Sequence, residues 1–170
     1  MVYSLHSASH FAFGKQQQRR NFVLDASRDL GVSYIYTNLL GNEAGRSIYD
    51  GGAMIASQGE LVAAGPRLTF HDLQLTTAVV DIEPDNVEPA AADGAGQVTA
   101  PFTFPACQPQ PARAELAAWE AGPHLKEEEF ARAVSLGLFD YLRKSRSHGF
   151  VVSLSGGADS ATVATLCGLL

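Results

Sequence analysis

Residues 153–160 of the chain read Ser153-Leu154-Ser155-Gly156-Gly157-Ala158-Asp159-Ser160. The run before them, Phe150-Val151-Val152, is short, apolar and β-branched, which is typical of a buried parallel strand. Residues 161–170 predict a helix whose apolar face carries Val163, Leu166, Cys167 and Leu170. A strand, a glycine turn and a helix N-terminus in this order favour anion binding, because turn amides, helix dipole and serine hydroxyls all offer donors. The sequence therefore predicts a phosphate-binding loop here.

Two familiar phosphate loops do not match this stretch. A Walker loop needs a lysine, and none occurs between Phe150 and Leu170, while the GxGxxG dinucleotide pattern needs more than one glycine pair. Residues 155–160 resemble instead the SGGxDS pyrophosphate loop of the N-type ATP pyrophosphatases, which adenylate a carboxylate or carbonyl oxygen and release pyrophosphate. For these six residues taken alone, a glycine turn with a serine helix cap and no ligand stays open as the alternative.

The composition excludes several other classes of function. With 46% hydrophobic and 18% charged residues among 170, the chain is globular in type. Its formal charge of -6 and its lack of clustered lysines and arginines argue against a nucleic-acid partner. The sequence shows no apolar run of membrane-spanning length and no signal-peptide pattern, so we expect no membrane contact and a cytoplasmic location. Cys107 and Cys167 are too few for a disulfide framework or a zinc site.

The first eighty or so residues read as part of an α/β sandwich. The patterns predict a helix over residues 16–30, a strand over 32–37, a hairpin over 53–64 and a further strand over 75–82. The helix stripe is expected to be apolar at Phe22, Val23, Ala26 and Leu30, with Arg19 outside it. Residues 1–15 read as a polar turn and an aromatic pair, and residues 38–52 as a long loop with Glu43, Arg46 and Asp50 unassigned.

A linker and a second helical region follow. Residues 84–125 are rich in Ala, Pro and Gly and read as an extended connection, in which Trp119 is expected to anchor against a flanking body. A helix is expected from Glu127, with Phe130, Val134, Leu138 and Leu142 repeating every four residues.

In this order, the segments resemble glutamine-dependent NAD⁺ synthetases. Ser7-Ala8-Ser9-His10-Phe11 with Gly14-Lys15 resembles the segment after the nucleophile of their nitrilase-like glutaminase domain, and residues 49–56 resemble a later strand of that domain. Residues 130–160 resemble the start of the synthetase domain. The resemblance implies an α/β fold in three parts: residues 1–83 as the C-terminal part of a nitrilase-like αββα sandwich, 84–125 as linker, and 126–170 as the opening helix-strand-loop-helix of a Rossmann-like adenine nucleotide alpha-hydrolase domain.

The family's chemistry joins two reactions. A Glu-Lys-Cys triad hydrolyses glutamine, and the ammonia attacks an adenylate formed from ATP and nicotinic acid adenine dinucleotide, which gives NAD⁺. The resemblance implies that Asp159 helps to place Mg²⁺, that Ser9 and Lys15 contact glutamine, and that the full enzyme is a homo-oligomer. It also implies an ATP site made of Ser153, Leu154, Ser155, Gly156, Gly157, Ala158, Asp159 and Ser160.

The sequence also departs from the family pattern. The triad belongs upstream of His6, and Leu5-His6 stands where relatives usually have Asn-Pro. We therefore expect a fragment of a longer enzyme, without glutaminase activity and with little or no ligase activity by itself. Two alternatives stay open: another ATP pyrophosphatase, such as a GMP synthetase or a tRNA-thiolating enzyme, and a non-catalytic module that binds nucleotide or mediates assembly.

Overall fold

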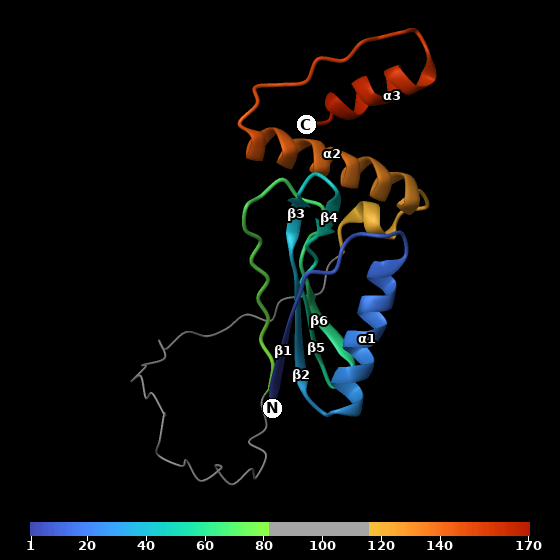
Figure 1. Ribbon diagram of the computed structural model, residues 1–170. Helices are drawn as coiled ribbons and strands as arrows, with labels where there is room; N and C mark the ends of the chain where they lie inside the picture. The colour runs from blue at the N-terminus through green and yellow to red at the C-terminus, as the bar shows by residue number, and fades with distance from the viewer. Residues whose placement is uncertain (82–115) are drawn as a thin grey trace, which may run out of the picture.

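A four-stranded mixed sheet with a helix on one face forms the N-terminal body of the computed structural model, which describes residues 1–81 and 116–170. The strand order is β1-β2-β5-β6, made of β1 (Val2–Ser7), β2 (Ser33–Asn38), β5 (Met54–Ser57) and β6 (Glu60–Ala64). β1 runs parallel to β2, and the other two pairings are antiparallel. Helix α1 (Lys15–Asp29) lies along this sheet (Figure 1), which confirms the predicted α/β class.

The core between α1 and the sheet explains why these segments fold locally as the patterns predict. Tyr34 and Tyr36 point to the same face of β2 because side chains alternate along a strand, and there they meet Val23 of α1. Met54 and Ala56 of β5 extend this face, and all five side chains are at most 3% exposed. Burial of this apolar surface holds α1 against the sheet.

The buried stripe of α1 differs from the predicted one. Phe22 and Leu30 are 53% and 63% exposed, whereas Arg19 is buried beside Val23 and Ser27. Arg19 can be buried because its guanidinium meets the Asp50 carboxylate, an interaction that hydrophobic periodicity does not contain.

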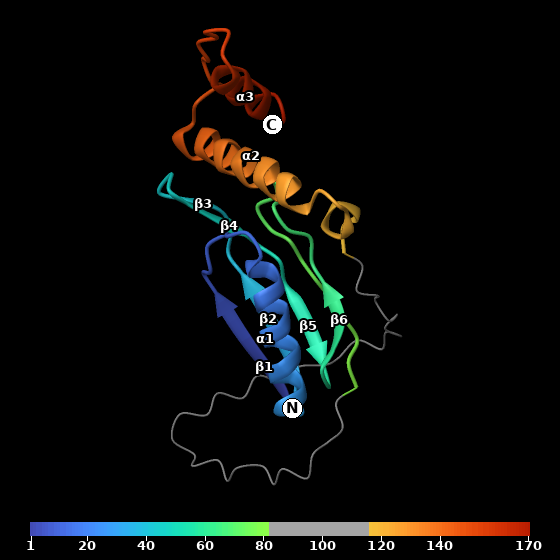
Figure 2. The same cartoon turned by 90° about the vertical axis from the view of Figure 1, so that its right-hand side faces the viewer.

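A second, two-stranded sheet stands where a loop was predicted. β3 (Leu40–Glu43) and β4 (Ser47–Asp50) form an antiparallel hairpin within residues 38–52. Helix α2 (Leu125–Ser145) lies across this hairpin (Figure 2), and Ile48 packs into the cluster that Leu136 of α2 shares with Leu68. The prediction failed because these two short strands are stabilised by a helix more than seventy residues away in the sequence.

The region around α2 confirms one expectation and corrects another. Trp119, in the short 3₁₀ helix η1 (Ala118–Ala121), packs on the Leu68–Leu136 cluster and is thus the expected anchor. The face of α2 that is buried carries Glu129, Ala133, Leu136 and Asp140, whereas Phe130 of the predicted stripe is 48% exposed. Residues 84–115 of the predicted linker lie outside the described residues, as does Cys107.

Three further segments differ from their predictions. Residues 2–7 form β1 instead of a polar turn, because their backbone pairs with β2 and Leu5 joins the α1 core. Residues 75–81 carry no strand hydrogen bonding, and Ile82 lies outside the described residues. Residues 150–152 are not a strand either, and Val151 is fully exposed at 104%. A parallel strand needs a neighbour, and none lies beside these residues in the described part of the chain.

The chain closes with α3 (Ala158–Cys167), which packs on α2 at the end of the molecule opposite to the N-terminus (Figure 1). Of its predicted apolar face only Leu166 is buried, Cys167 is partly buried, and Val163 and Leu170 are 47% and 38% exposed. Among residues 1–81 and 116–170, no helix has both the length and the hydropathy of a membrane span.

Candidate functional site

The glycine turn before α3 closes on itself and leaves the helix N-terminus open. Gly156 has φ +84°, a left-handed conformation that favours glycine, and Gly157 is extended as the N-cap residue. The Ser160 hydroxyl donates to the Gly157 carbonyl over 3.1 Å, and it accepts from the Ser155 amide at 3.3 Å. The Ser155 and Ser160 hydroxyl oxygens lie 3.2 Å apart. The turn is therefore curled into a small ring by its own serines.

This geometry provides donors for an anion. The first amides of α3, from Ala158 onward, have no acceptor within the helix, and the first intrahelical bond runs from the Ala161 amide to the Gly157 carbonyl. The positive end of the helix dipole lies at the same place. Residues 153–159 are exposed, with Leu154 at 67%, so an anion can reach these amides directly. The arrangement can bind phosphate oxygens.

Asp159 is the carboxylate that stands next to these amides, in the first turn of α3. No group of three or more His, Cys, Asp or Glu side chains suited to a metal ion occurs in the described part of the chain. Mg²⁺ in nucleotide sites is usually held by one or two carboxylates together with phosphate oxygens and water. A single exposed carboxylate beside a turn whose free amides can bind phosphate fits that donor set, so Asp159 could hold Mg²⁺ only together with a nucleotide.

Ser9 lies on the connection from β1 to α1, and Lys15 is the first residue of α1. The Lys15 ammonium donates to the His10 carbonyl over 3.0 Å, and Asn38 binds both the backbone amide and the backbone carbonyl of Ser9. The Ser9 amide donates to Asn38 Oδ1 and the Asn38 side-chain amide donates to the Ser9 carbonyl, each at 2.9 Å. Arg19 adds hydrogen bonds to the Ser9 carbonyl at 2.8 Å and to the Ser9 hydroxyl at 3.1 Å. Of the two predicted glutamine contacts, Ser9 is thus held by hydrogen bonds from Asn38 and Arg19, and Lys15 by one bond to the His10 carbonyl.

Sequence reasoning assigned no role to Asp50, which the structure places at the centre of this segment's support. Asp50 is 1% exposed and accepts both short hydrogen bonds of Arg19, at 2.7 and 2.8 Å, and one from Asn38 at 2.9 Å. Arg67, which follows β6, lies 3.5 Å from the other Asp50 oxygen. The only signal in the sequence was an acidic residue in a glycine-rich loop, which is equally typical of a solvated turn.

Arg67 connects Asp50 to η1 and α2. Its guanidinium bonds to Glu120 at 2.7 Å and to Glu129 at 2.9 Å, and all three side chains are at most 5% exposed. Burial alone lowers the pKa of Arg67, but the charge of Glu120, the hydrogen bonds to Glu120 and Glu129 and the charge of Asp50 raise this pKa more. Arg67 therefore stays charged at every accessible pH.

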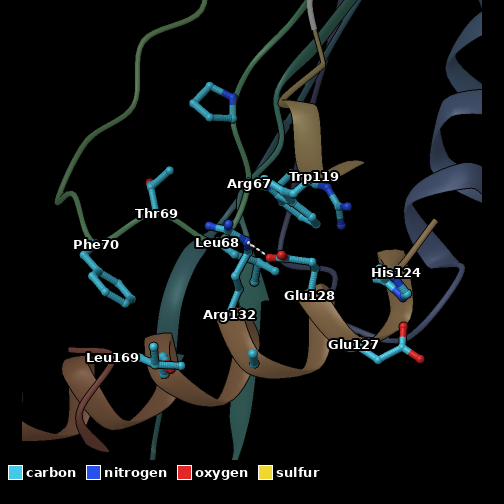
Figure 3. Close-up of a pocket in the computed structure, with 13 residues that line it drawn as sticks. Arg67, Leu68, Thr69, Phe70, Trp119, His124, Glu127, Glu128, Arg132 and Leu169 are labelled. Carbon is cyan, nitrogen blue, oxygen red and sulfur yellow. Dashed lines mark hydrogen bonds and ion pairs between the residues drawn. The ribbon is translucent and has the colours of Figure 1, made fainter. Parts of the chain in front are cut away.

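A groove of about 670 Å³ lies between the segment after β6 and the first half of α2 (Figure 3). Trp119 lies at one end of it with the Arg67 and Arg132 guanidinium groups over its ring, at 5.1 and 4.8 Å from the centroid. Leu169 lines the groove near its other end, and Arg132 bonds to Glu128 along its wall. None of the predicted site residues lines this groove.

The structure keeps the two predicted sites apart. Residues 153–160 lie at the end of α2 and the start of α3, whereas Ser9 and Lys15 lie at the end of β1 and the start of α1 (Figure 1). α2 is the element between them, because it packs on the β3–β4 hairpin on one side and on α3 on the other.

Comparison with known proteins shows which proteins this chain is similar to. The family model described as NAD synthase matches residues 130–170. The chain is 34% identical over 173 residues to the glutamine-dependent NAD(+) synthetase of Oryza sativa subsp. indica, and 30% identical to that of Saccharomyces cerevisiae; these alignments cover 96% and 94% of the chain. A crystal structure of a glutamine-dependent NAD(+) synthetase from Cytophaga hutchinsonii is 38% identical, with a TM-score of 0.63 over 96% of this chain and 21% of its own.

The resemblance to glutamine-dependent NAD⁺ synthetases is confirmed. The chain spans about a quarter of the length of the curated relatives that it matches, 24% for both the Oryza and the Saccharomyces proteins. The residues that match the family model, 130–170, include the glycine turn.

Proposed function

We propose that this chain is part of a glutamine-dependent NAD⁺ synthetase and carries the phosphate-binding loop of its ATP site. One observation carries the proposal: the sequence Ser155-Gly156-Gly157-Ala158-Asp159-Ser160 opens the N-terminus of α3, within the residues that match the NAD synthase family model. A helix N-terminus after a glycine turn supports phosphate binding physically, and the relatives' names support the reaction.

In the proposed reaction, the loop binds the phosphates of ATP while the carboxylate of nicotinic acid adenine dinucleotide is adenylated. The amides after Gly157 and the Ser153 hydroxyl donate to phosphate oxygens, and Leu154 and Ala158 complete the turn. The Ser155 and Ser160 hydroxyls donate to phosphate once they exchange the hydrogen bonds that they make within the turn. Mg²⁺, when bound, neutralises charge on the leaving pyrophosphate, and Asp159 is the residue of this loop that would hold it. Ammonia then displaces AMP and gives NAD⁺.

Ser9 and Lys15 are proposed as glutamine contacts. Lys15 supplies a cation suited to the α-carboxylate of glutamine, and its position beside the His10 carbonyl keeps it near the Ser9 segment. In this proposal, residues 1–83 are the nitrilase-like part, 84–125 the connection and 126–170 the start of the synthetase part of a homo-oligomeric enzyme. The packing of α2 on the β3–β4 hairpin supports a close association of the first and last parts.

Calorimetric titration of the 170-residue protein with Mg–ATP, and separately with metal-free pyrophosphate, tests the loop assignment. We expect both to bind, and we expect Asp159→Asn to weaken Mg–ATP by about tenfold, which is ~1.4 kcal/mol, without weakening pyrophosphate. The two responses differ because only Mg–ATP needs the carboxylate.

The matched control is Asp25→Asn, which makes the same change at an exposed carboxylate on α1. Absence of binding by the unaltered protein, or equal responses of the two variants, would overturn the assignment.

A further inference from the structure

The side chains of Arg19 and Asn38 hold the Ser9 carbonyl, and both also donate to the Asp50 carboxylate. The two donors lie 2.8 and 2.9 Å from the Ser9 carbonyl oxygen. Arg19 reaches one step further, to the His10 carbonyl at 3.1 Å. Asp50 therefore orients the two side chains that set the position of the Ser9–His10 peptide.

Asp50 has in turn a third partner, Arg67, which faces two more carboxylates. Glu120 belongs to η1 and Glu129 to α2, so this arginine joins the sheet to elements more than fifty residues later in the chain. The cluster has the two guanidinium groups of Arg19 and Arg67 against the carboxylates of Asp50, Glu120 and Glu129. All these side chains are at most 7% exposed.

Because the cluster is buried, the strength of each ion pair in it depends on the charges of all the other side chains of the cluster. In a desolvated cluster, removal of one charge is not compensated by water, so the remaining ions redistribute among themselves. If Glu129 loses its charge, Arg67 loses one of its anions and is drawn more strongly to Asp50. Asp50 is then less available to Arg19 and Asn38, the two residues that hold Ser9.

We propose that Arg19, Asn38 and Asp50 are positioning residues for the Ser9–His10 peptide, and that Arg67 makes this peptide depend on Glu129 of α2. The link to glutamine recognition rests on the proposed function above, whereas the dependence of the Ser9 peptide on α2 does not. In this arrangement, α2 is part of the support of the segment that would contact glutamine.

The test compares Glu129→Gln with Glu128→Gln. Both substitutions remove one carboxylate charge from neighbouring positions of α2, but Glu128 pairs with Arg132 at the surface, where both side chains are 42% exposed. The first readout is hydrogen exchange of the Ser9 amide, which donates to Asn38 Oδ1. We expect Glu129→Gln to accelerate this exchange by about tenfold, as local loosening does, and Glu128→Gln to leave it unchanged.

The second readout is the dissociation constant of L-glutamine, measured by calorimetry with the same proteins. We expect an increase of about tenfold for Glu129→Gln and none for Glu128→Gln. A purely structural role of Glu129 would shift the urea midpoint without selective exchange at Ser9, and that result would overturn the inference.

The two proposals fail separately. If the unaltered protein binds no glutamine, the glutamine assignment of Ser9 and Lys15 is wrong, while the exchange of the Ser9 amide still decides whether α2 supports this peptide. If glutamine binds and Glu129→Gln changes neither readout, the dependence on α2 is refuted and the glutamine assignment stands.

Discussion

Replacement of Gly41 by alanine should weaken the docking of α2 on the β3–β4 hairpin. Gly41 lies in β3 with φ +117°, and a Cβ atom there would lie 2.6 Å from Asp140 Oδ2 and 3.3 Å from Asp140 Cγ. The Asp140 carboxylate is a buried polar contact between α2 and β3, because it accepts the Asn42 amide at 2.6 Å and is 2% exposed. Alanine therefore forces this carboxylate away from the amide that it binds.

The expected cost has two parts. A non-glycine residue in such a backbone conformation costs roughly 1–3 kcal/mol. Loss of the charge-assisted hydrogen bond from the Asn42 amide adds about 1.5–3 kcal/mol. We expect Gly41→Ala to lower the free energy of unfolding by about 3–5 kcal/mol, a large part of the stability of an ordinary small domain.

The matched control is Gly31→Ala. Gly31 also has a positive φ, +61°, but nothing lies within 4 Å of the position of its Cβ, so it should lose only about 1–2 kcal/mol of backbone strain. Urea unfolding followed by the fluorescence of Trp119, the single tryptophan of the chain, reports directly on the region where α2 docks. Equal losses in the two variants would refute the clash, and with it the role of Asp140 in docking α2.

Two further predictions follow from buried and hydrogen-bonded side chains. The pKa of Tyr49 is raised, chiefly by the hydrogen bond that its hydroxyl donates to Glu43 at 3.1 Å. Glu43→Ala should return the pKa of Tyr49 toward 10. NMR titration of labelled tyrosine measures this pKa, and an unchanged value in the variant would contradict the prediction. Because the folded pKa is the higher one, this stabilisation is present below pH 10 and is lost as the pH rises through the folded pKa. Ser27→Ala should cost ~1–3 kcal/mol in urea unfolding, because the hydroxyl of fully buried Ser27 donates to the Val32 carbonyl at 2.7 Å and accepts the Gly59 amide at 3.2 Å. Ser135→Ala makes the same change at a buried hydroxyl that has no partner in the described part of the chain, and equal costs would refute this account.

The glycine turn shows which features the sequence alone predicts and which depend on the tertiary structure. Its composition predicts a helix N-terminus after it, and α3 indeed begins at Ala158, because glycine and serine at such positions act through local backbone geometry. The strand predicted before the turn is absent among the described residues, since strand pairing needs a neighbour that no local pattern contains.

Local patterns were sufficient for the positions of α1, β2 and the β5–β6 hairpin in the sequence, but not for the buried face of α1, where Arg19 replaces Phe22 and Leu30. They were insufficient for Asp50, Arg67 and Glu129, because nothing in the sequence distinguishes these charged residues from exposed ones. Their meeting was decided by the tertiary structure alone, because a buried ion cluster is assembled from residues tens of positions apart, and only folding brings their charges within hydrogen-bonding distance in a place that excludes water.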